Sequence, residues 1–94
     1  MKYVVYLLIS KTKKRYISYV GYTNNLEKRI NLHNSGKGAK FTRGKKWILL
    51  YKKYYNTKRK AMAEEFKLKN NKKKRSIIKL QYINKNESFN FTSI

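Results

Sequence analysis

One uncharged segment near the start of the chain limits what this sequence can fold into. Residues 3 to 9 read YVVYLLI, a run of β-branched, aromatic and aliphatic side chains in a chain where 25 of 94 residues are Lys or Arg. The run shows no alternation of apolar and polar positions, which is typical of a strand buried on both faces. It therefore predicts the central strand of a sheet.

Two further segments predict the other strands of that sheet. Residues 16 to 21 (YISYVG) form a second apolar and aromatic run, separated from the first by the polar, basic residues 11 to 15. Two short strands joined by a tight polar loop favour a β-hairpin. Residues 47 to 55 (WILLYKKYY) are the third strand candidate.

Two segments with capping signals predict helices that cover the sheet. Asn24 and Glu27 have the spacing of a capping box, and the helix after them is expected to end near Gly36. The stripe that favours this helix consists of Leu26, Ile30 and His33. Thr57 is placed to cap a second helix over residues 58 to 70. The element order β-β-α-β-α indicates a mixed α/β (α+β) domain.

The chain is long enough for one domain only. A basic run at residues 72 to 75 precedes an apolar stretch between residues 77 and 83, which predicts a third helix. The polar and aromatic residues 84 to 94 are expected to form a weakly ordered tail. The predicted domain therefore spans residues 1 to 83.

The charge balance predicts a polyanion as the partner. Lys and Arg number 25 against four acids, so the formal net charge is +21, and self-repulsion at that density weakens the compact state. Phosphate backbones bind such surfaces through counterion release. Residues 35 to 46 hold five of the basic residues in what we expect to be a mobile loop. A basic protein without such a partner, or one that binds RNA or the ribosome, is an alternative.

Several classes of site are excluded by what the chain lacks. It has no cysteine, which excludes disulfides, thiolate metal ligands and cysteine nucleophiles. A single histidine excludes a zinc site built from several histidines. No apolar run approaches the ~20 residues of a membrane span, and no segment has one strongly basic amphipathic face. We therefore expect a cytoplasmic protein with no membrane partner.

Glu65 is the carboxylate that points inward on a helical wheel of residues 61 to 69. Ala61, Met62 and Leu68 define the inward arc, with Glu65 near its middle and Glu64 at its edge. A carboxylate aimed at a core needs a partner. A divalent cation is one such partner, and a neighbouring lysine or arginine is the alternative.

Four other residues are candidates whose spacing alone leaves their role open. Arg29 and His33 are one helical turn apart and share a face, but an arginine there is usually solvated and such a histidine is more often packed than catalytic. Tyr6 and Tyr19 lie on adjacent predicted strands, where cross-strand packing accounts for both.

These candidates follow one another in a recognisable order. In chain order the residues are Val4-Val5-Tyr6, Tyr19-Val20-Gly21, Arg29, His33 and Glu65. This order, together with the run YVGYTNNLEKRINLHNSGKGAKFTRGKKW, resembles the GIY-YIG nuclease family over roughly residues 3 to 70. It resembles the small stand-alone bacterial branch of the family, and also the nuclease half of the Slx-type branched-DNA nucleases. The chain departs from the family where the first motif lacks its glycine and where Tyr22 replaces a common lysine.

The resemblance implies a three-stranded antiparallel sheet flanked by helices, and an endonuclease that needs Mg²⁺ or Mn²⁺. In such an enzyme Tyr6 and Tyr19 line the site, and one of them orients or deprotonates the attacking water. Arg29 contacts the scissile phosphate and, with the metal, lowers the tyrosine pKa. His33 relays a proton. Glu65 holds the single cation, and hydrolysis leaves a 5′-phosphate and a 3′-hydroxyl.

DNA is the expected partner, including branched or flapped DNA in repair or recombination, and we expect the protein to associate with the nucleoid. The residues predicted to bind the DNA backbone are Lys37, Lys40, Arg43, Lys45 and Lys46. No small-molecule cofactor is expected, and the sequence does not identify protein partners. The alternative from another class is a non-catalytic, basic nucleic-acid-binding module that retains the nuclease fold.

Overall fold

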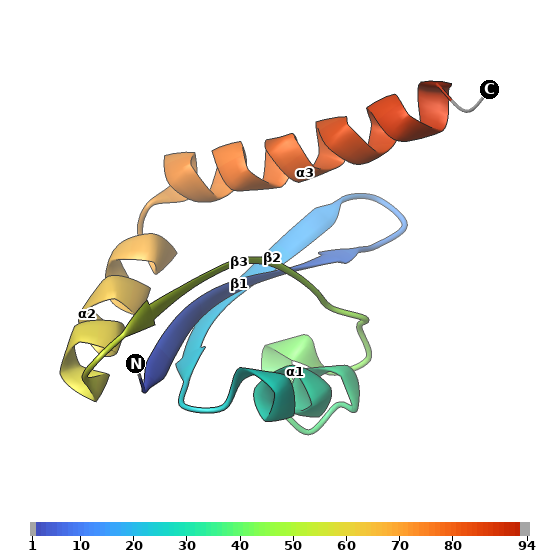
Figure 1. Ribbon diagram of the computed structural model, residues 1–94. Helices are drawn as coiled ribbons and strands as arrows, with labels where there is room; N and C mark the ends of the chain where they lie inside the picture. The colour runs from blue at the N-terminus through green and yellow to red at the C-terminus, as the bar shows by residue number, and fades with distance from the viewer. Residues whose placement is uncertain (1, 93–94) are drawn as a thin grey trace.

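The computed structural model describes the backbone of residues 2–92 and the side chains of residues 2–85. Its elements are, in order, β1 (Tyr3–Lys11), β2 (Tyr16–Thr23), α1 (Leu26–Asn34), the short 3₁₀ helix η1 (Lys40–Thr42), β3 (Ile48–Tyr55), α2 (Lys58–Lys69) and α3 (Lys72–Thr92). Helix α1 lies on one side of the sheet, and α2 and α3 lie on the other (Figure 1). The predicted α+β class with a three-stranded sheet is therefore confirmed.

The sheet has the order β2-β1-β3, and both strand pairs are antiparallel. Strand β1 is thus central, and every residue from Val4 to Ile9 is at most 2% exposed. This confirms the prediction from the apolar run. In the β1–β2 register, Tyr6 pairs with Gly21 and Leu8 pairs with Tyr19. Since paired residues share a face, Tyr6 and Tyr19 are diagonal neighbours on one face of the sheet.

The two faces of the sheet have different cores. On one face, Val5 and Leu7 pack against Ala61 and Leu68 of α2. On the other face, Tyr6 lies against the buried His33 of α1. The second face therefore has polar groups in its core, whereas the core of the first face is apolar.

Three local predictions need correction. The N-cap of α1 is Asn25, whose side chain accepts from the Lys28 N–H at 3.1 Å, and not Asn24. Strand β2 runs two residues further than predicted, and the Thr23 hydroxyl holds the Asn25 N–H at 3.1 Å, which moves the helix start by one residue. Met62 is 47% exposed, because α2 buries only the narrow line from Ala61 to Leu68.

The second cap and the third helix agree better with the predictions. Thr57 caps α2 by accepting from the Lys60 N–H at 3.1 Å, as predicted. Helix α3 extends well beyond residue 83, to Thr92. The side chains from 86 onward lie outside the described residues, so the boundary at 83 and the weak order of the tail stay predictions. In the part of the chain described here, no helix is long and apolar enough to span a membrane.

Candidate active site

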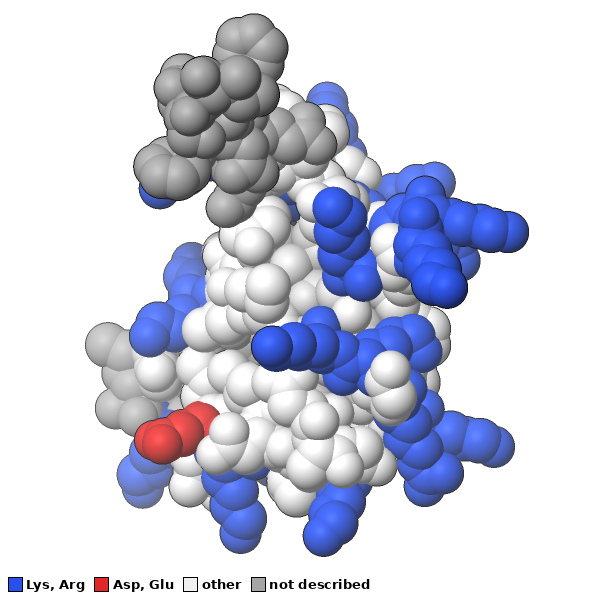
Figure 2. All heavy atoms as spheres, turned by 90° about the vertical axis from the view of Figure 1, so that its right-hand side faces the viewer, with Lys and Arg blue, Asp and Glu red and all other residues white. Residues whose placement is uncertain are grey.

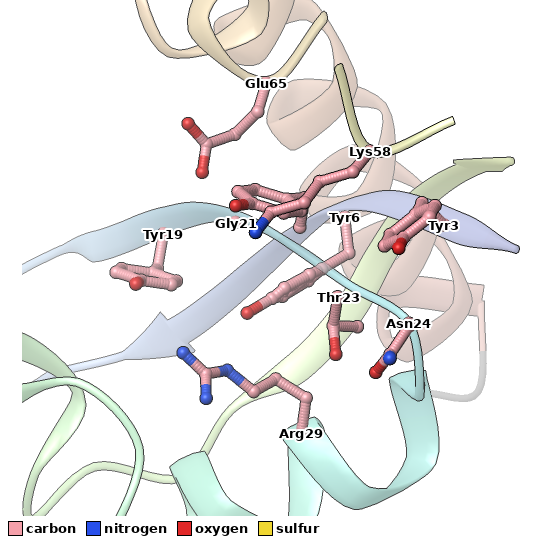
Figure 3. A pocket seen from close by; sticks show the side chains of 10 residues that line it. Tyr3, Tyr6, Tyr19, Gly21, Thr23, Asn24, Arg29, Lys58 and Glu65 are labelled. Atoms are coloured by element: carbon pink, nitrogen blue, oxygen red, sulfur yellow. The ribbon is translucent and has the colours of Figure 1, made fainter. Parts of the chain in front are cut away.

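A pocket of about 390 Å³ opens at the β2 edge of the sheet. Its walls come from both strands of the hairpin and from the helices on either side, and are formed by Tyr3, Tyr6, Tyr19, Gly21, Tyr22, Thr23, Asn24, Arg29, Lys58 and Glu65. Arg29 points in from α1 and Glu65 from α2, with the two tyrosines between them (Figure 3). We call this the edge pocket. Tyr6, Tyr19, Arg29 and Glu65 line it as predicted, whereas His33 does not.

Gly21 has no side chain because the Tyr6 ring occupies that space. A Cβ built on Gly21 would lie 2.5 Å from the Tyr6 hydroxyl oxygen and 2.6 Å from its Cζ. Both atoms belong to a buried ring that has no room to move away. The glycine of the second motif therefore allows the Tyr6 hydroxyl to reach the edge pocket across β2.

His33 lies behind Tyr6 and is fully buried. Its Nε2 is 2.9 Å from the Tyr6 hydroxyl, and its Nδ1 is 2.9 Å from the Thr42 hydroxyl. Thr42 in turn donates to the Ala39 carbonyl at 2.8 Å. Because a carbonyl oxygen only accepts, the Thr42 hydroxyl uses its one proton on Ala39 and must accept from His33, which sets the direction of every hydrogen bond in this series. His33 donates from Nδ1 to Thr42, and Nε2 accepts the proton of Tyr6.

Burial governs the protonation of His33 and Tyr6 in this series of hydrogen bonds. Burial, followed by the Arg29 charge, lowers the pKa of His33, so the imidazole is neutral at pH 7 and suited to accept a proton. Burial raises the pKa of Tyr6 to about 12, although the Arg29 guanidinium acts in the opposite direction. Arg29 lowers the Tyr6 pKa, as expected, but desolvation of the phenolate outweighs this contribution, so the net pKa of Tyr6 is raised.

Arg29 carries a buried donor that lacks an acceptor. Among the described side chains, the Arg29 Nε is the buried polar atom with no hydrogen-bond partner. Buried donors are rarely left in this condition, since the desolvation cost is not recovered. A phosphate oxygen in the edge pocket is an acceptor that matches the charge and the fork geometry of the guanidinium. Lys58 points into the same space and adds a second cation (Figure 3).

Glu65 is partly buried and has one ion-pair partner. Its side chain is 19% exposed, and its Oε1 lies 3.6 Å from the Lys69 Nζ. The alternative prediction, a pair with a neighbouring lysine, is thus also present. No group of three or more His, Cys, Asp or Glu residues is gathered in the part of the chain that the structure describes. A Mg²⁺ ion fits a single carboxylate when water and substrate phosphate supply the remaining oxygens.

The predicted DNA-binding loop lies outside the edge pocket and is held in part by buried residues. Its basic side chains are exposed, except for the half-buried Lys45. The Trp47 indole donates to the Thr42 carbonyl at 3.0 Å, and the Asn34 side chain holds the Trp47 N–H at 2.6 Å. Residues 40 to 42 form the helix η1. The loop is therefore anchored at its centre and at its end, and its mobility stays a prediction.

Sequence reasoning did not identify two residues that belong to this region. Thr42 is nine residues from His33 in an irregular segment, so no periodicity relates them. Lys58 is one cation among 25 Lys and Arg, and only its position at the start of α2 brings it to the pocket. A buried hydroxyl and a pocket-lining cation both depend on tertiary structure, which composition does not encode.

Comparison with known proteins gives a match over most of the chain. Residues 2–88 match the family described as the GIY-YIG catalytic domain. A UPF0213 protein of Bacillus pumilus is 52% identical over 54% of this chain and 53% of its own length. UPF0213 proteins of Clostridium perfringens and Bacillus cereus are 46% and 44% identical, over 68% and 76% of this chain and 69% and 72% of their own lengths. The chain thus matches only about half of the Bacillus pumilus protein. No solved structure matches.

Proposed function

This chain belongs to the GIY-YIG family, and from that premise we propose that it is a divalent-metal-dependent DNA endonuclease. The observation that carries the proposal is the edge pocket, into which Arg29 and Glu65 point from helices on opposite faces of the sheet (Figure 3). A cation, a carboxylate and two tyrosines around a polar cavity are the groups that phosphodiester hydrolysis needs. Branched or flapped DNA is the proposed substrate.

The scissile phosphate binds to Arg29 in this proposal. Its Nε–H has no acceptor among the described groups, so a phosphate oxygen satisfies a donor that folding leaves unpaired. Lys58 provides a second positive charge in the edge pocket. The two cations together supply the charge stabilisation that grows as negative charge develops on the phosphoryl oxygens. Many family members have a lysine at the position of Tyr22, and Lys58 provides an ammonium group in the same pocket.

The proton of the attacking water leaves through Tyr6 and His33. With a pKa of about 12, Tyr6 is protonated at pH 7 and cannot act as a preformed base. Its own proton already points to the neutral Nε2 of His33, so the Tyr6 oxygen can accept a proton from the water while the Arg29 guanidinium lies beside it. As the water oxygen attacks phosphorus, its proton passes to Tyr6 and the Tyr6 proton passes to His33. The P–O3′ bond breaks, and the 3′ oxygen takes a proton from solvent.

Glu65 is the residue proposed to hold the divalent cation, which when bound neutralises charge on the phosphate. The Glu65 carboxylate is 19% exposed and faces the same pocket as Arg29. The partner that it has in the absence of metal is Lys69, at 3.6 Å and on its own helix. A surface ion pair of this kind contributes little and is easily exchanged for a stronger ligand.

The experiment that tests the proposal is a cleavage assay. End-labelled duplex, flap and four-way-junction DNA are incubated with the protein in Mg²⁺, in Mn²⁺ and in EDTA. We expect cleavage in the metal-containing samples alone, with 5′-phosphate products. Cleavage that persists in EDTA, or a metal-loaded protein that cuts none of the substrates, contradicts the proposal.

The rival function is DNA binding without cleavage. The observation that favours it is the Lys69–Glu65 pair, which occupies the carboxylate that the enzyme needs for metal. Both functions predict steep salt dependence of binding, because both rest on the charge of +21. Only the cleavage assay separates them.

A further inference from the structure

A second cavity lies beside the edge pocket. It has a volume of about 640 Å³ and lies between the β1–β2 turn and η1, lined by Thr12, Lys13, Lys14, Arg15, Ile17, Phe41 and Lys45. The Phe41 ring stacks on Tyr19, with ring centroids 6.3 Å apart and planes 20° apart. Tyr19 also lines the edge pocket. We call this cavity the turn groove, and Tyr19 is the residue that joins the two sites.

The turn groove combines an aromatic floor with a cationic rim. Phe41 is 53% exposed although it is a large apolar ring, and Ile17 beside it is half-buried. The Lys45 ammonium lies 5.4 Å from the Phe41 ring centre. The other three cations come from the turn, and no acid lines the groove. On the face that Figure 2 presents, Lys and Arg side chains lie around and across uncharged surface, with an acidic side chain at the lower left.

We propose that the turn groove binds unpaired nucleotides of a DNA strand next to the cleaved bond, with one base stacked on Phe41. This inference rests on the proposed nuclease function. An aromatic face offers stacking to any base, and cations around it bind the flanking phosphates. Bases inside an intact duplex are already stacked and cannot reach the ring. The groove therefore favours DNA that has a single-stranded segment beside the edge pocket over blunt duplex.

The charge of the groove selects this ligand over a neutral or cationic one. Four cations and no acid line the cavity, so its ligand must be anionic as well as partly apolar. A single DNA strand provides both, as phosphates alternate with bases along its length. A stack from Phe41 through Tyr19 then leads the strand to the edge pocket.

The test compares two DNA probes in EDTA, so that binding is measured without cleavage. One probe is a fluorescent blunt duplex, and the other is the same duplex with a single-stranded thymidine tail. We expect the unmodified protein to bind the tailed probe more tightly. Phe41→Ala should reduce this preference at least about fivefold, the lower end of what stacking one base contributes. Phe41→Trp should retain the preference because it keeps an aromatic face.

The matched control is Phe66→Ala, which removes the more exposed phenylalanine, at 67%, from α2 outside the groove. It should leave the preference unchanged. Equal preferences in Phe41→Ala and the unmodified protein, or an equal loss in Phe66→Ala, overturn the inference. The same probes with Mg²⁺ test the nuclease separately. A protein that prefers the tailed probe but cuts neither contradicts the proposed function and supports the groove.

The cations of the groove provide an independent measurement. Changing Lys13 and Lys14 together to Ala should flatten the salt dependence of binding to the tailed probe by between one and two units, since each phosphate contact to a single strand contributes about 0.7. A slope that does not change for the tailed probe contradicts the placement of the strand in the turn groove.

Discussion

The two glutamates of α2 lie next to each other in sequence and are almost equally buried, yet they face different surroundings. Glu64 is 22% exposed and is held by Lys60 at 3.3 Å and Lys67 at 3.1 Å. The hydrogen bond from Lys67 lowers the pKa of Glu64. Glu65 is 19% exposed, has one ion-pair partner at 3.6 Å and faces the edge pocket. Burial alone does not distinguish the two; the groups across from each carboxylate do.

The difference arises because the two side chains flank the buried line of α2. The helix packs on the sheet through Ala61 and Leu68, and positions 64 and 65 project to opposite sides of that line. The Glu64 side is a small cavity of about 190 Å³ that includes Lys53, Lys67 and Lys74, so the carboxylate is compensated by lysines. The Glu65 side faces Arg29 and the tyrosines. We therefore expect changes on the Glu65 side to affect cleavage, and changes on the Glu64 side to affect stability.

Apart from Glu65 itself, the largest effect on the Glu65 side is expected for Arg29→Ala. Loss of a cation that stabilises the transition state should reduce single-turnover cleavage by about 10²- to 10³-fold. The melting temperature should change little, because removal of the unpaired, buried Nε–H offsets the loss of the interaction between the guanidinium and Tyr6. Arg59→Ala, at an exposed position on α2, is the control. If Arg29→Ala is strongly destabilised but still cleaves DNA, Arg29 has a structural role and the prediction is contradicted.

The pH dependence of cleavage reports on His33. Its pKa is lowered by burial and by Arg29, so it accepts a proton from Tyr6 at pH 7 and loses that capacity only when the pH falls below its folded pKa. Cleavage should be constant near pH 7 and fall on the acidic side, with the limb displaced below the ordinary value of about 6.5.

Stability should follow the same group. Below about pH 6.5 the unfolded histidine binds a proton that the folded one does not, so the free energy of unfolding should decrease as the pH falls toward the lower folded pKa. Denaturant unfolding at several pH values measures this, with His33→Gln as the control that lacks the titration. If the decrease of cleavage at acidic pH persists unchanged in a Tyr6→Phe variant, it does not arise from proton transfer through Tyr6 to His33, which contradicts the proposed proton path.

A smaller effect is expected for Thr42→Val, which keeps the shape and removes the hydroxyl that accepts from His33. The His33 Nδ1–H then loses its acceptor, and the tautomer that receives the Tyr6 proton is no longer favoured. Cleavage should decrease by on the order of tenfold, the cost of one unsatisfied buried donor, while DNA binding stays the same. A variant that cuts at the original rate would show that the hydrogen bonds from His33 through Thr42 to Ala39 have no part in the reaction.

The smallest effect concerns binding. Lys40 and Arg43 lie on the predicted DNA-binding loop, and changing both to Ala should flatten the salt dependence for every DNA shape by about two units. Lys60 and Lys67, which hold Glu64, give a control pair with the same change in charge. An equal flattening in the two double variants would mean that net charge, and not the loop, determines the slope.

The sheet was predictable because its information is local. The apolar run at residues 3 to 9 has no polar position that can face water, so it becomes the central strand β1. Thr57 provides a cap at a helix start, and the structure uses it. The family resemblance adds the four residues that meet in the edge pocket.

The proton chain and the turn groove depend on contacts between segments that are distant in sequence. His33 and Thr42 are joined by a loop whose path is determined by the buried Trp47, not by any periodic pattern. Phe41 lies in the same irregular segment, and its contact with Tyr19 follows from that path. The helical wheel included Met62 in the buried arc, although α2 covers a narrower line than the wheel assumed. These features appear only when the elements are assembled.

The most direct test of the account is a comparison of Glu65→Gln with Glu64→Gln on one substrate at fixed salt and Mg²⁺. Glutamine keeps the shape but loses the charge that holds a hard cation. Glu65→Gln should bind DNA at least as tightly as the unmodified protein and cleave it 10²-fold or more slowly. Glu64→Gln should retain its activity and melt at a slightly lower temperature. Equal losses of cleavage in both variants, or normal cleavage by Glu65→Gln, would contradict the assignment of Glu65 as the metal ligand.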